Sequence, residues 1–168
     1  MIPRPATEAD IQPICDLVNH FAEQNLMLQR TPEQVRMALG DFLVVGDQNQ
    51  MVGDQNQMVG DQNQVLGCGY IAHLSATLAE IRSLAVHPDH QGEGLGGLVV
   101  DHLVEMARAR GVQKICALTL APDFFYRQGF HRVNRWSISP KIWGECVYCP
   151  KFHACDEIAV LKILDSGE

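Results

Sequence analysis

Apolar residues recur at helical spacing in two parts of the chain. Between about 8 and 24 they form one stripe, and the run Thr7-Glu-Ala-Asp before it is typical of a helix start. A second stripe predicts an amphipathic helix from about 95 to 110, which Gly111 ends. Thr31 and Pro32 predict the start of a shorter helix between the two, with Gly40 as its stop.

Short apolar runs predict strands in the rest of the chain. They cover 42–45, 65–71, 80–86, 114–120, 130–137 and 158–164, and a short helix from Pro122 to Gly129 separates two of them. The middle of the chain therefore reads strand, glycine loop, helix, strand, short helix, strand. That order predicts an α/β or α+β fold in which helices pack on a sheet, as one domain over 1–168.

A repeated heptad lies between the strands predicted over 42–45 and 65–71. Met-Val-Gly-Asp-Gln-Asn-Gln occurs at 51–57 and 58–64, and a copy that differs only at its first residue spans 44–50. An odd period puts successive copies on opposite faces of a strand, which disfavours a long amphipathic hairpin. Removing 51–64 leaves FLVVGDQNQVLGCGYI, which reads as one ordinary hairpin. We therefore predict that 51–64 is a duplicated insertion in a surface hairpin. The entropy cost of closing a loop grows only slowly with its length, so the fold can accommodate these residues.

Composition and charge narrow the class of protein. Apolar residues make up 46% of the chain, as in globular proteins, and the formal net charge is −7. Such a charge offers no basic field for nucleic acid. No apolar run approaches the ~18 residues that span a bilayer, and MIPRPATEAD lacks the apolar stretch of a signal peptide. We expect a cytoplasmic protein with no nucleic-acid or membrane partner.

The glycine loop in HPDHQGEGLGGLVV is the most informative stretch. Glycines there let the backbone approach a ligand, and the start of the following helix favours a phosphate. Gly92, Gly94 and Gly97 also match G-x-G-x-x-G, but residues 87–91 separate them from the strand, unlike in a dinucleotide-binding unit. The P-loop motif is absent. A pyrophosphate ligand bound through backbone N–H groups fits the loop best.

The same loop carries a family resemblance. Gln91-Gly92-Glu93-Gly94-Leu95-Gly96 matches Q/R-x-x-G-x-G/A, the pyrophosphate loop of the GNAT acyltransferases. MIPRPATEADI, EIRSLAVHPDHQGEGLG and FFYRQGF are similar to three further parts of that fold, so the resemblance covers nearly the whole chain. It implies the GNAT acyl-CoA N-acyltransferase fold, with a mixed, mostly antiparallel central sheet flanked by helices, and acetyl-CoA as co-substrate.

Three segments extend the resemblance to one group within the family. QNLMLQRTPEQV, ALTLAPDFFYRQGF and SISPKIWGECVYCPKFHACDEIAV resemble the short, stand-alone N-acetylglutamate synthase type. That type implies acetyl transfer to the α-amino group of L-glutamate, the reaction that opens arginine biosynthesis. The alternatives are another amine (an amino acid, a polyamine or a protein N-terminus) or a non-catalytic acetyl-CoA sensor. Oligomeric state stays open, a homodimer included.

The resemblance assigns the co-substrate to two segments and one aromatic residue. The backbones of Leu84, Ala85 and Val86 would pair with the pantetheine arm. The pyrophosphate would lie on Gln91, Gly92, Gly94, Leu95, Gly96 and Gly97. Phe125 stands where many members carry a tyrosine that protonates the leaving thiolate, so we do not transfer that role. Phe125 is expected to pack against the co-substrate, and Tyr126 to point elsewhere.

Glu80 is the candidate general base, because it matches the position of the base in several members and can act through a water molecule. A carboxylate that only solubilises a strand end is the alternative interpretation. His87 and His90 are alternative bases, although a histidine beside a proline in a loop is more often a surface residue.

Two carboxylates on glutamate require cationic partners. Arg82, Arg30 and Lys141 lie in the segments that carry the resemblance, and Arg82 is favoured because it interrupts an otherwise apolar strand. A place on the solvated face of that strand is the alternative for Arg82.

Three cysteines near the C-terminus pose a separate question. Cys146-x-x-Cys149 followed by Cys155 resembles part of a zinc site, but a second paired knuckle is absent. Reduced thiols are the favoured interpretation, and zinc or a redox dithiol at Cys146 and Cys149 are the alternatives.

Overall fold

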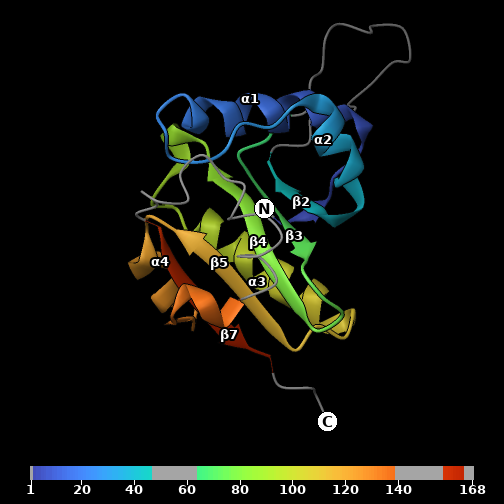
Figure 1. The fold of residues 1–168 in the computed structure, drawn as a ribbon. Helices are drawn as coiled ribbons and strands as arrows, with labels where there is room; N and C mark the ends of the chain where they lie inside the picture. Colours follow the sequence, from blue (N-terminus) through green and yellow to red (C-terminus); the bar gives the residue numbers. More distant parts are fainter. Residues whose placement is uncertain (1, 47–63, 139–156, 165–168) are drawn as a thin grey trace, which may run out of the picture. The chain divides into compact units, whose positions relative to one another are not determined.

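The computed structural model describes residues 2–46, 64–138 and 157–164 (Figure 1). Contacts divide the chain into two compact units, Met1–Tyr70 with Ser83–His102, and Ile71–Arg82 with Leu103–Glu168. The described helices are α1 (Ile11–Ala22), α2 (Pro32–Met37), α3 (Leu95–Ala109) and α4 (Pro122–Arg127). The described strands are β1 (Arg4–Pro5), β2 (Phe42–Val45), β3 (Gly67–His73), β4 (Leu78–Val86), β5 (Lys114–Thr119), β6 (His131–Arg132) and β7 (Ile158–Ile163).

Within the described residues, these strands form one seven-stranded sheet in the order β1-β2-β3-β4-β5-β7-β6. The β4–β5 pair is parallel, whereas β1–β2, β2–β3, β5–β7 and β6–β7 are antiparallel. A mixed, mostly antiparallel sheet with helices is the predicted fold class, and it is confirmed. None of the helices in these ranges is both long and apolar enough to cross a membrane.

The first unit begins with a tightly bonded turn. A 3₁₀ turn, Glu8–Asp10, precedes α1, so the helix predicted over 8–24 divides in two. The buried Asp10 carboxylate accepts hydrogen bonds from both terminal nitrogens of Arg4, at 2.7 and 2.8 Å, and from Thr7 N–H at 2.8 Å. Burial disfavours the ionised carboxyl, but these hydrogen bonds outweigh burial and lower the pKa of Asp10.

A capping box starts α2, as Thr31 and Pro32 predict. Thr31 Oγ1 accepts from Gln34 N–H at 3.2 Å, and Gln34 Oε1 accepts from Thr31 N–H at 3.0 Å. The helix ends at Met37, and Gly40 instead lies in a 3₁₀ turn, Leu39–Asp41.

The predicted hairpin is described at its two strands only. β2 and β3 pair antiparallel up to Val45 and Gly67, and a Cβ on Gly46 would collide with the carbonyl oxygen of Gln64. The chain segments on either side of 47–63 therefore lie side by side, as a hairpin requires. Of the predicted insertion at 51–64, residues 51–63 lie outside the described residues, so the prediction stays untested.

The second unit packs strands β5 and β7 around an apolar cluster. Its buried members are Leu78, Cys116, Ile138, Ala159 and Leu161. The strand predicted over 130–137 is wrong in its second half, because His131–Arg132 pairs with β7 and the last backbone bond to that strand among the described residues is from Val133 N–H to the Ala159 carbonyl, at 3.0 Å. Asn134 Oδ1 accepts from Trp136 N–H at 2.9 Å, and the chain then turns through a 3₁₀ segment, Arg135–Ile138.

Candidate active site

The glycine loop forms the start of α3. Leu98 N–H donates to the Gly94 carbonyl at 3.1 Å, so Gly94 begins the helix. The N–H groups of Leu95, Gly96 and Gly97 follow in its first turn, where no intrahelical acceptor exists. Gly92 and Gly94 both have a φ of 82°, and a Cβ at either would meet no atom within 4 Å. The loop therefore offers N–H groups beside open space, which fits a phosphate.

Side chains just before and within the loop form hydrogen bonds with neighbouring residues. Gln91 Nε2 donates to the Val86 carbonyl at 3.3 Å, which ties the loop to the end of β4. His87 Nδ1 accepts from Asp89 N–H at 3.1 Å, and His90 Nδ1 lies 3.2 Å from Glu93 Oε2. Both histidines, the alternative bases, are thus engaged in holding the 3₁₀ turn Pro88–His90 and the loop after it.

β4 contains a left-handed residue. Ser83 has a φ of 52°, a conformation that residues other than glycine rarely adopt inside a strand. Two contacts from the first unit hold it: Arg30 Nε donates to Ser83 Oγ at 3.2 Å, and the Cys68 thiol donates to the Ser83 carbonyl at 3.4 Å. Burial raises the pKa of that thiol to about 12, so Cys68 serves as a neutral donor. Leu84, Ala85 and Val86 follow directly, so the strand is distorted just before the backbone assigned to pantetheine.

Glu80 and Arg82 form an ion pair on one face of β4. Arg82 Nε donates to Glu80 Oε1, as side chains two apart on a strand can. Glu80 is only 2% exposed, and the Arg82 side chain is 16% exposed. Arg82 therefore does not lie on a solvated face and Glu80 does not solubilise a strand end, which were their alternative interpretations. The general-base role of Glu80 stays a prediction.

Arg30 contacts Tyr70 and Ser83, and sequence patterns did not reveal these contacts. Its guanidinium carbon lies 5.8 Å from the centre of the Tyr70 ring, and its Nε bonds to Ser83. Among the described residues, no hydrogen bond or ion pair reaches its terminal Nη1 and Nη2 groups. Arg30 is thus a half-buried cation whose two terminal nitrogens can donate hydrogen bonds to a ligand.

Phe125 points inward, whereas Tyr126 does not. Phe125 is 5% exposed and meets the Phe130 ring edge to face, with the ring centres 5.2 Å apart. Tyr126 is 39% exposed, as expected for a residue that points elsewhere. Lys141, Cys146, Cys149 and Cys155 lie outside the described residues. In the part of the chain that is described, no three His, Cys, Asp or Glu side chains cluster as metal ligands would.

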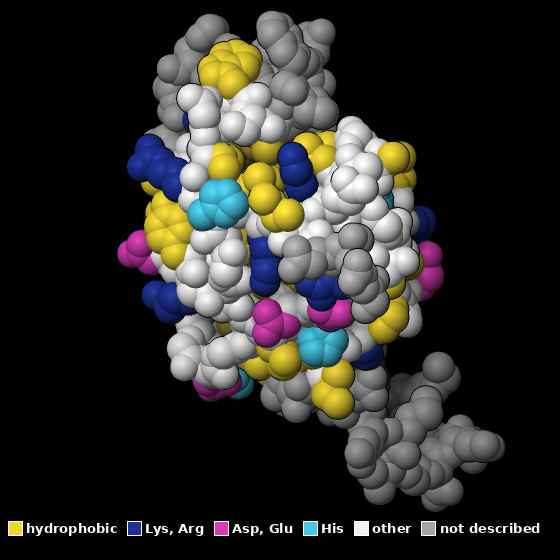
Figure 2. Space-filling model, turned by 90° about the horizontal axis from the view of Figure 1, so that it is seen from below, with side chains coloured by type: hydrophobic (Ala, Val, Ile, Leu, Met, Phe, Trp, Pro, Cys, Tyr) yellow, Lys and Arg dark blue, Asp and Glu magenta, His cyan; other side chains and the backbone are white. Residues whose placement is uncertain are grey.

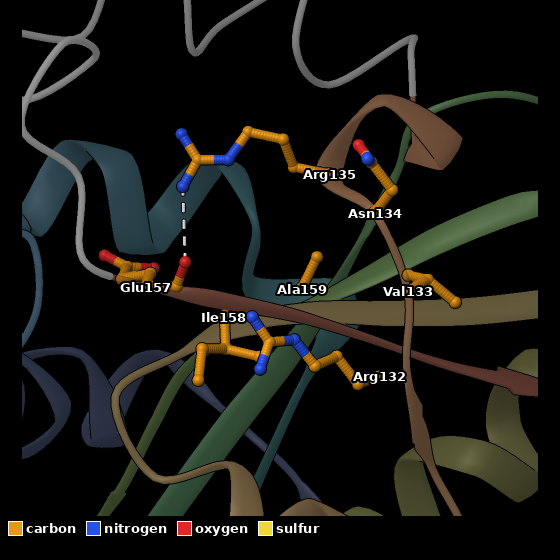
Figure 3. A pocket seen from close by; sticks show the side chains of 7 residues that line it. All are labelled: Arg132, Val133, Asn134, Arg135, Glu157, Ile158 and Ala159. Carbon is orange, nitrogen blue, oxygen red and sulfur yellow. Dashed lines mark hydrogen bonds between the residues drawn. The ribbon is translucent and has the colours of Figure 1, made fainter.

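A separate pocket of about 520 Å³ lies in the second unit, between the β6 turn and the start of β7 (Figure 3). Arg135 reaches across it, and its Nη2 donates to the Glu157 carbonyl at 3.2 Å. Sequence reasoning did not single out any of its lining residues, Arg132, Val133, Asn134, Arg135, Glu157, Ile158 and Ala159. On the face shown in Figure 2, basic and acidic side chains are interspersed.

Comparison with known proteins identifies the family. The Acetyltransferase (GNAT) family model matches residues 25–133. An uncharacterized N-acetyltransferase of Chlorobaculum tepidum is 35% identical over 161 residues, which cover 96% of this chain and 95% of that protein. An amino-acid acetyltransferase of Mycobacterium tuberculosis is 28% identical over 162 residues, covering 96% of this chain and 83% of that protein.

Two solved structures share the fold. A Mycobacterium tuberculosis protein in complex with CoA has a TM-score of 0.78 and 26% identity, with 98% of this chain and 99% of that chain covered. N-acetylglutamate synthase from Neisseria gonorrhoeae, complexed with coenzyme A and N-acetyl-glutamate, has a TM-score of 0.76 and 21% identity over 96% of this chain and 34% of that chain. With the glycine loop at the start of α3, these matches show that the chain belongs to the GNAT acetyltransferase family and is an acetyl-CoA-dependent N-acetyltransferase.

Proposed function

We propose that the chain transfers the acetyl group of acetyl-CoA to the α-amino group of L-glutamate, as an N-acetylglutamate synthase. Two relatives support an amino-acid acceptor: the Mycobacterium tuberculosis protein named amino-acid acetyltransferase, and the Neisseria gonorrhoeae synthase complexed with N-acetyl-glutamate. The three sequence segments that resemble the stand-alone N-acetylglutamate synthase type are the third line of support.

The main structural support for this proposal is the guanidinium of Arg30. Arg82 already pairs with Glu80, whereas Nη1 and Nη2 of Arg30 have no partner among the described residues. A half-buried guanidinium whose Nε is occupied can bind a carboxylate through its two terminal nitrogens. An acceptor with carboxylates satisfies that geometry, whereas a polyamine would add positive charge beside it. Arg30 therefore takes one carboxylate of the acceptor.

Direct transfer then divides the work between the loop and β4. The loop from Gln91 to Gly97 holds the pyrophosphate, and acetyl-CoA supplies the activated thioester. A backbone N–H among Leu84 to Val86 donates to the thioester oxygen as negative charge develops on it. Glu80 takes the ammonium proton through a water molecule, since its carboxylate is buried. The amine nitrogen bonds to the acetyl carbon and gives up its second proton to water, and the carbon–sulfur bond breaks. The thiolate leaves unprotonated or takes a proton from water, because Phe125 carries none.

Arg30→Gln tests the assignment. Loss of charge-assisted hydrogen bonds, each worth about 1.5–3 kcal/mol, should raise KM for glutamate at least tenfold. KM for acetyl-CoA should not change. Arg36→Gln is the matched control, since Arg36 is exposed and pairs only with Glu8 at 3.4 Å among the described residues. An unchanged glutamate KM in Arg30→Gln would show that Arg30 does not bind the acceptor.

A further inference from the structure

Asn19 on α1 bonds to both backbone groups of Arg30. Its Nδ2 donates to the Arg30 carbonyl at 3.0 Å, and its Oδ1 accepts from Arg30 N–H at 2.9 Å. Arg30 lies in the connection between α1 and α2, which has no regular ladder of its own to supply these partners. One side chain therefore satisfies the residue's donor and acceptor together, and sets where its Cα lies.

The chain on the other side of Arg30 is fixed as well. Thr31 begins α2 in a reciprocal capping box with Gln34, so hydrogen bonds also hold the residue that follows Arg30. Asn19 thus holds the backbone of Arg30, and the capping box holds the residue that follows it.

Two more contacts direct the side chain itself. Ser83 accepts from Nε at 3.2 Å, and the Tyr70 ring lies under the guanidinium. Tyr70 is in turn held by Phe42, with the ring centres 4.5 Å apart. Because Nε and one face of the guanidinium are engaged, the edge that carries Nη1 and Nη2 is the part left to meet a ligand.

We infer that Asn19 is a positioning residue for the acceptor: it places Arg30 so that the terminal nitrogens form a preorganised clamp for a carboxylate. The inference rests on the proposed function, because it takes the acceptor to be a carboxylate bound by Arg30. A clamp that is already ordered binds without the entropy cost of ordering a long side chain on each encounter. Asn19 contributes to acceptor binding and takes no part in the chemical step.

The test is a split between KM and kcat in Asn19→Ala. KM for glutamate should rise about tenfold, equivalent to about 1.4 kcal/mol, while KM for acetyl-CoA stays the same and kcat stays within about twofold. Gln12→Ala is the matched control, because it removes one exposed side-chain hydrogen bond, to Asp16, from the same helix. If Asn19→Ala does not fold, Asn19→Asp keeps the acceptor, loses the donor and should raise the glutamate KM in the same direction.

A double variant separates positioning from general damage. In Arg30→Gln, Asn19 has no clamp to position, so adding Asn19→Ala should leave the glutamate KM unchanged from that of Arg30→Gln alone. Additive effects, or an unchanged glutamate KM in both Asn19 variants while Arg30→Gln raises it, would overturn the inference and leave the proposed function standing. An unchanged KM in Arg30→Gln would overturn both.

Discussion

Replacing Gly94 with alanine tests whether the loop before α3 holds the pyrophosphate. Gly94 has a φ of 82°, which costs a residue with a Cβ about 1–2 kcal/mol. The added methyl meets no atom within 4 Å, so no collision adds to that cost. For a chain of this length the melting temperature should therefore fall by about 2–8 °C.

Gly111 is a matched control for this strain. It also has a φ of 82°, its Cβ would likewise meet no atom within 4 Å, and it lies past the C-terminal end of α3. Gly111→Ala should thus lower the melting temperature about as much as Gly94→Ala. Only Gly94→Ala should weaken acetyl-CoA binding, because the methyl would stand in the space that a phosphate needs beside the loop.

The loss of binding can be estimated from the hydrogen bonds involved. Displacing the pyrophosphate from even one backbone N–H removes a charge-assisted bond worth about 1.5–3 kcal/mol, so the Kd for acetyl-CoA should rise at least tenfold. Titration calorimetry with acetyl-CoA, beside thermal unfolding of both variants, measures the two effects separately. Equal acetyl-CoA affinity in Gly94→Ala and Gly111→Ala would refute the assignment of the loop.

Two further predictions concern buried carboxylates. Glu80→Gln should lower kcat by about 10²–10⁴ with little change in KM for acetyl-CoA, and full activity at neutral pH would exclude Glu80 as the base. Asp10→Asn should destabilise the protein at neutral pH. Because the folded-state pKa of Asp10 is lowered, the native carboxylate stabilises the protein above its unfolded pKa of about 4, and this stability is lost as pH falls through the folded value. Urea unfolding of both proteins should therefore give a difference that shrinks in acid, and a difference independent of pH would contradict the role of the Arg4–Asp10 pair.

Local signals in the sequence were sufficient for the loop and its helix. The apolar stripe predicted a helix from about 95 to 110, and α3 spans Leu95–Ala109. The glycine spacing located the loop, because Gly92 and Gly94 adopt a conformation that few other residues tolerate. The Glu80–Arg82 pair was also within reach of the sequence, since residues two apart on a strand share a face.

Contacts between distant residues were beyond such reasoning. Arg30 and Ser83 are 53 residues apart, and no local pattern announces that a serine will adopt a left-handed conformation inside β4. Asn19 is an ordinary polar position on an amphipathic helix until the chain folds back to bring Arg30 to it. The strand predicted over 130–137 was wrong in its second half for a local reason: the Asn134 side chain bonds to the backbone of Trp136 and competes with the ladder.

The proposed acceptor is a carboxylate-bearing amino acid, L-glutamate. The most direct test of this proposal is steady-state release of CoA from acetyl-CoA by the purified protein, with glutamate, aspartate, lysine and a polyamine as separate acceptors. We expect the highest kcat/KM with glutamate, and a large loss of that value in Arg30→Gln but not in Arg36→Gln. Preferred turnover of lysine or the polyamine, or tight binding of acetyl-CoA with no turnover of any amine, would contradict the proposal.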